Sequence, residues 1–142
     1  VAFDIGGPGQ TSYQIAEWRR VIEKYHNIHF IACHILVPKQ LEQPGWAEEL
    51  KSIAAGNTWF DFAAIPYNNM QEYPYPTAVK LVEQAAEIVG VDRLMWGSDA
   101  PFVLSYATYA QLRDYIRESG VFGDGDLRKL YGENAVQAYR IR

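Results

Sequence analysis

The sequence has almost no cysteine, no excess of positive charge and no long apolar run, and each absence excludes a class of protein. Its single cysteine, Cys33, cannot form an internal disulfide or a cysteine-based zinc cage, and it favours a reducing, cytoplasmic compartment. Thirteen Lys and Arg residues against 17 Asp and Glu give a net charge of −4, so we expect no nucleic-acid partner. No apolar run reaches the roughly 18 residues of a membrane helix, and no signal peptide is visible, so we expect no membrane partner either.

Apolar residues are present in the proportion that a globular protein needs. They make up 49% of the 142 residues, which predicts one folded domain over residues 1–142 rather than a disordered chain. The chain begins with Val1 instead of Met, inside a segment with the pattern of a buried strand. Because a natural N-terminus seldom opens within such an element, we expect the chain to be truncated from something longer.

Strand and helix patterns alternate along the chain. Strands are predicted at 1–5, 28–35, 58–65 and 93–97, and helices at 15–25, 46–55, 77–89, 106–119 and 127–131. Thr11 or Ser12 can cap the first helix, and Asn134 can cap a short last one. Alternation of this kind predicts parallel βα units. Four such units fit either a small doubly wound sheet or half of a (β/α)₈ barrel, which typically needs about 250 residues.

In both architectures the chemistry belongs just beyond the carboxyl ends of the strands. Two candidates follow apolar strands directly: His34, which opens a long loop, and Asp99, which precedes Pro101. An acid at the end of a buried strand needs a metal, a proton to transfer or a positive neighbour, although a turn-capping role is the simpler alternative. Asp4 and Asp61 are further acids within apolar strands, one at a strand end and one in mid-strand.

Three other features have simpler interpretations. The turn Gly6-Gly7-Pro8-Gly9 lies where phosphate loops lie, but it lacks the lysine or third glycine of a nucleotide motif, so a sharp turn is favoured. Cys33 and His34 are neighbours in a predicted strand and should point apart, which argues against a catalytic pair. His26 and His29 are expected on a solvated surface away from the site.

The segment Val91-Asp92-Arg93-Leu94-Met95-Trp96-Gly97-Ser98-Asp99-Ala100-Pro101 resembles the eighth-strand motif of the amidohydrolase-related (amidohydrolase 2) TIM-barrel hydrolases. Gly132-Glu133-Asn134-Ala135 is similar to the closing segment of that family, and His34 with Pro38 is similar to the sixth-strand motif of its lactonase-like branch. The stretch 46–65 also resembles that branch through its seventh strand. The resemblance implies an α/β fold that is the C-terminal half of a (β/α)₈ barrel.

The resemblance also implies a function. It implies hydrolysis of a lactone C–O bond or a C–N bond in a small carboxylated substrate, with Asp99 as base or metal ligand and His34 as electrophilic partner or ligand. The Tyr-rich loop at 67–75 would wall the pocket through Tyr67, Tyr73 and Tyr75. The implied cofactor is a divalent metal, with zinc favoured, and Asp4 stands where many members carry a metal-binding histidine. That departure, and the absence of a first-strand H-x-H, leave metal-independent catalysis open.

Two alternatives stay open at this point. One is a metal-dependent decarboxylase of the same superfamily. The other is an inactive half barrel or a pairing module, since exposed sheet edges favour association into a homo-oligomer.

Overall fold

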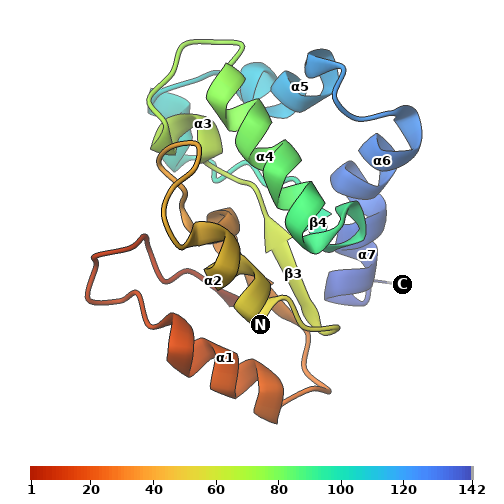
Figure 1. The fold of residues 1–142 in the computed structure, drawn as a ribbon. Helices are drawn as coiled ribbons and strands as arrows, with labels where there is room; N and C mark the ends of the chain where they lie inside the picture. The colour runs from red at the N-terminus through yellow and green to blue at the C-terminus, as the bar shows by residue number, and fades with distance from the viewer. Residues whose placement is uncertain (142) are drawn as a thin grey trace.

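Four short parallel strands form the framework of the computed structural model, which describes residues 1–141 (Figure 1). The strands are β1 (Ala2–Phe3), β2 (Phe30–Ala32), β3 (Thr58–Asp61) and β4 (Leu94–Met95). They pair side by side in chain order, and every pair is parallel. A helical crossover therefore joins each strand to the next, as the alternating pattern predicts.

Helical segments follow every strand. The α-helices are α1 (Ile15–Lys24), α2 (Trp46–Ile53), α3 (Ile65–Asn68), α4 (Pro76–Val89), α5 (Tyr109–Ser119), α6 (Asp124–Arg128) and α7 (Asn134–Tyr139). Three 3₁₀ turns, η1 (Cys33–Leu36), η2 (Val91–Arg93) and η3 (Phe102–Ser105), and a π-helical turn, η4 (Lys129–Glu133), connect them. Over the described residues, none of these helices has the length and apolarity needed to cross a bilayer.

The sheet has two faces with different coverings, because side chains alternate along a strand. The main core lies on one face, where α1, α2, α4 and α5 pack against Phe30, Ala32, Phe60 and Leu94. Figure 1 shows α2 and α4 lying in front of β3 on this side. On the opposite face, Ile31, Trp59 and Met95 form a smaller buried cluster with Ala138 of α7.

The strands are shorter than predicted because the backbone turns abruptly at their carboxyl ends. The strand predicted at 28–35 ends at Ala32, and the next residues, His34, Ile35, Leu36 and Val37, all have positive φ, between 43° and 63°. The strand predicted at 58–65 likewise ends at Asp61, before Ala64 takes a φ of 57°. Left-handed backbone cannot continue a strand, and a hydrophobicity pattern carries no sign of it.

Four polar residues differ from their predicted roles or positions. Neither Thr11 nor Ser12 caps α1, which follows Gln14 without a side-chain cap; the Ser12 hydroxyl donates instead to the Ile5 carbonyl at 2.9 Å. Asn134 is a buried residue with helical backbone rather than a cap. The histidine at 29 is half-buried, with its ring centroid 4.6 Å from that of Trp59, so its expected solvated position was wrong.

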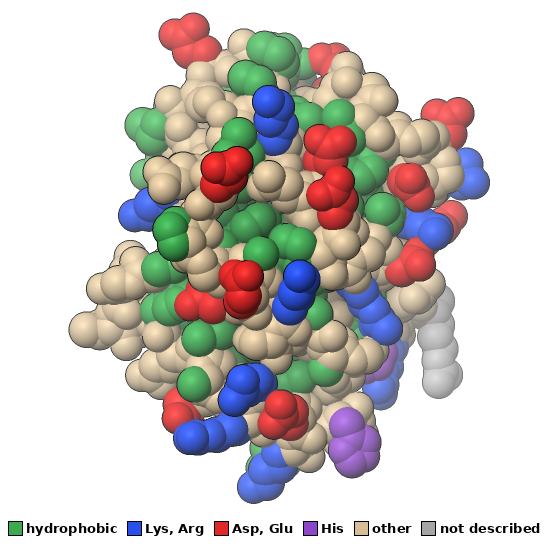
Figure 2. Space-filling model, in the orientation of Figure 1, with side chains coloured by type: hydrophobic (Ala, Val, Ile, Leu, Met, Phe, Trp, Pro, Cys, Tyr) green, Lys and Arg blue, Asp and Glu red, His purple; other side chains and the backbone are tan. Residues whose placement is uncertain are grey.

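The helix-covered face carries charges of both signs. Figure 2, in the same orientation as Figure 1, shows acidic and basic side chains intermixed across it, with apolar side chains exposed between them. This mixture is what the nearly balanced composition of 13 basic and 17 acidic residues predicts.

Candidate functional site

A cleft of about 450 Å³ opens at the carboxyl ends of the strands. Its walls come from the loops after all four strands, so it lies where parallel α/β proteins place their sites. The residues lining it include four of the predicted ones, Asp4, His34, Tyr67 and Asp99. The others are Gly6, Gly7, Gln10, Val37, Lys39, Ala64, Asn68 and Phe102.

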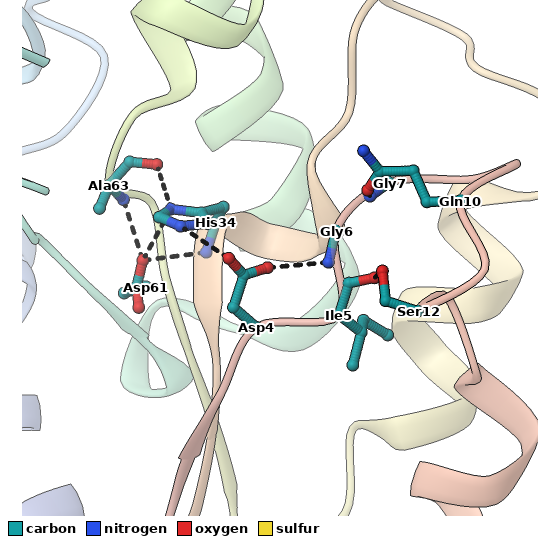
Figure 3. Close-up of polar contacts among 9 residues, drawn as sticks. All are labelled: Asp4, Ile5, Gly6, Gly7, Gln10, Ser12, His34, Asp61 and Ala63. Carbon is teal, nitrogen blue, oxygen red and sulfur yellow. Dashed lines mark hydrogen bonds and ion pairs between the residues drawn. The ribbon is translucent and has the colours of Figure 1, made fainter. Parts of the chain in front are cut away.

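His34 occupies the centre of a polar network (Figure 3). Its Nδ1 lies 3.0 Å from the carbonyl oxygen of Ala63, and its Nε2 lies 3.8 Å from Oδ2 of Asp4. A carbonyl can only accept a hydrogen bond, so Nδ1 carries a proton and donates it. Nε2 is therefore the ring nitrogen that faces Asp4.

Asp4 borders His34 and also shapes the glycine-rich turn. Its Oδ1 accepts the backbone N–H of Gly6 at 2.8 Å, and Gln10 Oε1 accepts the N–H of Gly7 at 2.9 Å. A β-carbon at Gly6 would lie 1.8 Å from Gln10 Oε1, and its φ of 68° also favours glycine. The side chains of Asp4 and Gln10 thus already accept the hydrogen bonds of these two amides. This supports the sharp-turn interpretation over a phosphate loop.

Asp61 lies on the other side of the imidazole, as Figure 3 shows. It is the last residue of β3, not a mid-strand residue. Its Oδ1 is 3.8 Å from His34 Nδ1 and accepts the backbone N–H of His34 at 2.9 Å. The sequence pattern marked this acid as unusual within an apolar strand but could not show its partner.

The thiol of Cys33 is close to the same carboxylates and is not an activated nucleophile. Burial contributes most, followed by the charge of Asp61, a hydrogen bond to it and the charges of Asp4 and Asp99, and together these raise the pKa of Cys33 to about 12. Nucleophilic cysteines need a lowered pKa, so the thiol stays protonated near neutral pH. This agrees with the expectation that Cys33 and His34 do not form a catalytic pair.

Asp99 reaches the cleft from the loop after β4, where its backbone takes a φ of 54°. This left-handed conformation is uncommon outside glycine, and Asp and Asn are the side chains that tolerate it best. The turn directs the chain into Pro101 and η3, and Phe102 of η3 also lines the cleft.

The three tyrosines predicted to wall the pocket lie in different places. Tyr67 lines the cleft and packs edge-to-face against Phe102, with ring centroids 5.1 Å apart. Tyr75 is buried against Tyr106 and Tyr115, and Tyr73 donates to Glu118 of α5. Tyr73 and Tyr75 are therefore not brought to the cleft that holds His34 and Asp99.

The donors available for a metal are fewer than a zinc site requires. Zinc sites in proteins use at least three protein ligands. Within residues 1–141, no three His, Cys, Asp or Glu side chains converge in such a group. The expected ligands Asp4, His34 and Asp99 are thus not assembled into a metal site by this chain alone, although His34 Nε2 and Asp4 Oδ2 face one another at 3.8 Å.

Zinc binding tests this geometry directly. Because His34 and Asp4 supply only two facing donors, we expect the 142-residue chain to retain no stoichiometric zinc after dialysis. The metal content can be measured by inductively coupled plasma mass spectrometry, with His34→Ala as the matched control. One zinc per chain that disappears in His34→Ala would contradict the prediction.

Comparisons with known proteins were made for sequence and for structure. The family model described as Amidohydrolase matches residues 7–141. A search of curated proteins gives no significant match. An amidohydrolase from Burkholderia multivorans, solved with bound zinc, superimposes with a TM-score of 0.77 at 17% identity, covering 99% of this chain and 53% of that one.

Two further solved structures are similar. A putative 2-pyrone-4,6-dicarboxylic acid hydrolase from Pseudomonas putida has a TM-score of 0.69 at 20% identity, covering 89% of this chain and 49% of that one. A 2,6-dihydroxybenzoate decarboxylase from Rhizobium has a TM-score of 0.58 at 14% identity, covering 95% and 44%. The chain therefore spans about half the length of these structures. Its four parallel βα units are half of a (β/α)₈ barrel, as predicted.

Proposed function

The chain belongs to the amidohydrolase family, and from that membership we propose that its cleft is part of a hydrolase site that cleaves the C–O bond of a lactone or a C–N bond. The observation that carries the proposal is the cleft itself, in which His34, Asp4 and Asp99 meet at the carboxyl ends of three strands. A base and a proton donor that line one small volume are what water attack on a carbonyl requires.

Asp99 is proposed as the base. Its carboxylate accepts a proton from the water that attacks the carbonyl carbon, and it returns that proton to the leaving oxygen or nitrogen. His34 in its protonated form donates from Nε2 to the carbonyl oxygen as negative charge develops there. Two carboxylates then flank the imidazolium, because Asp4 Oδ2 lies 3.8 Å from Nε2 and Asp61 Oδ1 lies 3.8 Å from Nδ1.

Lys39, a single positive side chain beside Asp4 and Asp99 in the lining of the cleft, supports a carboxylated substrate. Lys39 is the only Lys or Arg among the residues that line it, and the salt bridges formed within residues 1–141 do not include Lys39. A lysine in this position can pair with a substrate carboxylate while Tyr67 and Phe102 pack against the ring of the lactone. The name of the Pseudomonas relative, a hydrolase of a pyrone dicarboxylic acid, supports the same class of compound.

Product analysis tests the proposal. The intact barrel enzyme is incubated with carboxylated lactones and, separately, with hydroxylated aromatic acids, and released acid and carbon dioxide are both measured. We expect acid release from the lactones without carbon dioxide. Carbon dioxide from the aromatic acids would favour the decarboxylase alternative, which the Rhizobium neighbour keeps open. No product from either class would favour an inactive or pairing module.

A further inference from the structure

Asp61 contacts His34 but is not among the residues that line the cleft, and the proposed reaction gives it no contact with substrate. We propose that Asp61 is a positioning residue that fixes where the His34 imidazole carries its proton. Its carboxylate holds the ends of β2 and β3 so that Nδ1 of His34 donates to the Ala63 carbonyl and Nε2 is left facing Asp4. The catalytic value of this arrangement rests on the proposed function, whereas the arrangement itself does not.

One oxygen of Asp61 joins two strand ends. Oδ1 accepts the backbone N–H of His34 at 2.9 Å and the backbone N–H of Ala63 at 3.1 Å. His34 lies in the turn η1 after β2, and Ala63 follows β3, so the two amides lie just beyond neighbouring parallel strands. Hydrogen bonds to an ionised carboxylate are stronger than neutral ones, which suits this oxygen to act as a clamp.

The clamp determines which carbonyl meets the imidazole. With the Ala63 amide held by Asp61, the Ala63 carbonyl oxygen lies 3.0 Å from His34 Nδ1. That oxygen has no proton to donate, so the ring nitrogen facing it must be the donor. A hydrogen bond at one ring nitrogen sets the tautomer and the role of the other, as it does for catalytic and metal-binding histidines generally.

Two local features make the clamp necessary and possible. His34 has a φ of 58°, a conformation that a residue with a β-carbon adopts reluctantly without tertiary support. Gly97, from the segment after β4, approaches the same place: a β-carbon there would lie 3.0 Å from Cβ of Ala63 and 3.8 Å from Cβ of Asp61. The missing side chain at Gly97 therefore leaves room for Asp61 and Ala63 to occupy these positions.

The three histidines of the chain make the proposal testable in one spectrum. Two-bond proton–nitrogen correlations of ¹⁵N-labelled protein at pH 8 report the tautomer of each neutral imidazole. His29 is an internal control, because its Nδ1 lies 3.0 Å from the carbonyl of Ala138, and Asp61 does not hold the amide of that residue. His26 is exposed and gives the pattern of an unrestrained ring. We expect His34 and His29 to show the Nδ1–H pattern and His26 an averaged one.

Variants of Asp61 separate an effect on the His34 tautomer from a loss of the whole fold. In Asp61→Ala we expect His34 to lose the Nδ1–H pattern and move to the averaged pattern of His26, while His29 is unchanged. Asp61→Asn keeps an oxygen that can accept both amides, so it should retain the wild-type pattern at His34. If Asp61→Ala fails to fold, which the loss of the His29 pattern would show, the wild-type and Asp61→Asn spectra still decide.

An Nε2–H pattern for His34 in the wild type or in Asp61→Asn would overturn the proposal. So would an unchanged His34 in a folded Asp61→Ala. A failure of the proposed function looks different, because turnover would then be insensitive to His34→Ala whatever the tautomer.

Discussion

Replacing Asp99 by Asn is expected to reduce turnover by the intact barrel enzyme about 100- to 10,000-fold, the usual contribution of a general base. The amide has nearly the shape of the carboxylate but cannot accept the proton of the attacking water. Because the role proposed for Asp99 is in the chemical step, the loss should appear in kcat far more than in KM. Steady-state kinetics on the substrate found by product analysis measure both.

The choice of Asn matters because of the backbone. Asp99 has a φ of 54°, and Asn tolerates this conformation about as well as Asp, whereas Ala does not. The melting temperature of Asp99→Asn should therefore match the wild type. Asp99→Ala would add backbone strain to the loss of the carboxylate, and the two effects on turnover could not be separated. Asp92→Asn is a suitable control, because Asp92 pairs with Lys129 outside the cleft. Equal rates in Asp99→Asn and the wild type would remove Asp99 from the mechanism.

Asn134→Ala is expected to lower the free energy of unfolding by about 1–3 kcal/mol, because it removes the side-chain donor from the buried Leu94 carbonyl, and an unsatisfied buried group typically costs about that much. The half-buried Val91 carbonyl keeps the backbone N–H of Leu94 as a partner. The side chain of Asn134 is 1% exposed. Its Nδ2 donates to the carbonyl of Val91 at 2.7 Å and to that of Leu94 at 2.6 Å. The amide thus ties the start of α7 to both ends of the segment that leads into β4.

Urea denaturation of the 142-residue chain measures this loss. Asn134→Asp should be at least as destabilising, since a carboxylate would face the same two carbonyls with no proton to share. Asn27→Ala removes an exposed asparagine side chain and should change stability by less than about 0.5 kcal/mol. If Asn134→Ala were as mild as that control, the two hydrogen bonds would not hold β4 in place.

The order of strands and helices and the positions of the main site residues could be predicted from the sequence. Apolar runs separated by amphipathic segments identify parallel βα units. The carboxyl ends of the strands in such units lie at the same edge of the sheet, whatever conformation the loops adopt. His34 and Asp99 therefore come to one cleft with Asp4, as residues at the ends of three strands. The tertiary arrangement adds Lys39 and Phe102 to the lining, which no local pattern marks.

What could not be predicted depends on backbone turns and on partners distant in the sequence. The run of positive φ from His34 to Val37 ends β2 early, and nothing in an apolar pattern marks such a turn. Asn134 is a residue type typical of a helix cap. Its hydrogen-bond partners, the carbonyls of Leu94 and Val91, lie 40 and 43 residues away, so the side chain joins α7 to the segment that leads into β4 instead. Tyr67, Tyr73 and Tyr75 all lie in the Tyr-rich stretch 67–75, yet of the three only Tyr67, in α3, lines the cleft.

The most direct test of the central claim asks whether a substrate occupies this cleft. The intact barrel enzyme, labelled with ¹⁵N, is titrated with a carboxylated lactone under conditions in which turnover is blocked by Asp99→Asn. Among the three histidines of this chain, we predict that the imidazole signals of His34 shift on binding while those of His26 and His29 stay in place. Shifts at His26 or His29 with none at His34 would place the substrate elsewhere and contradict the account.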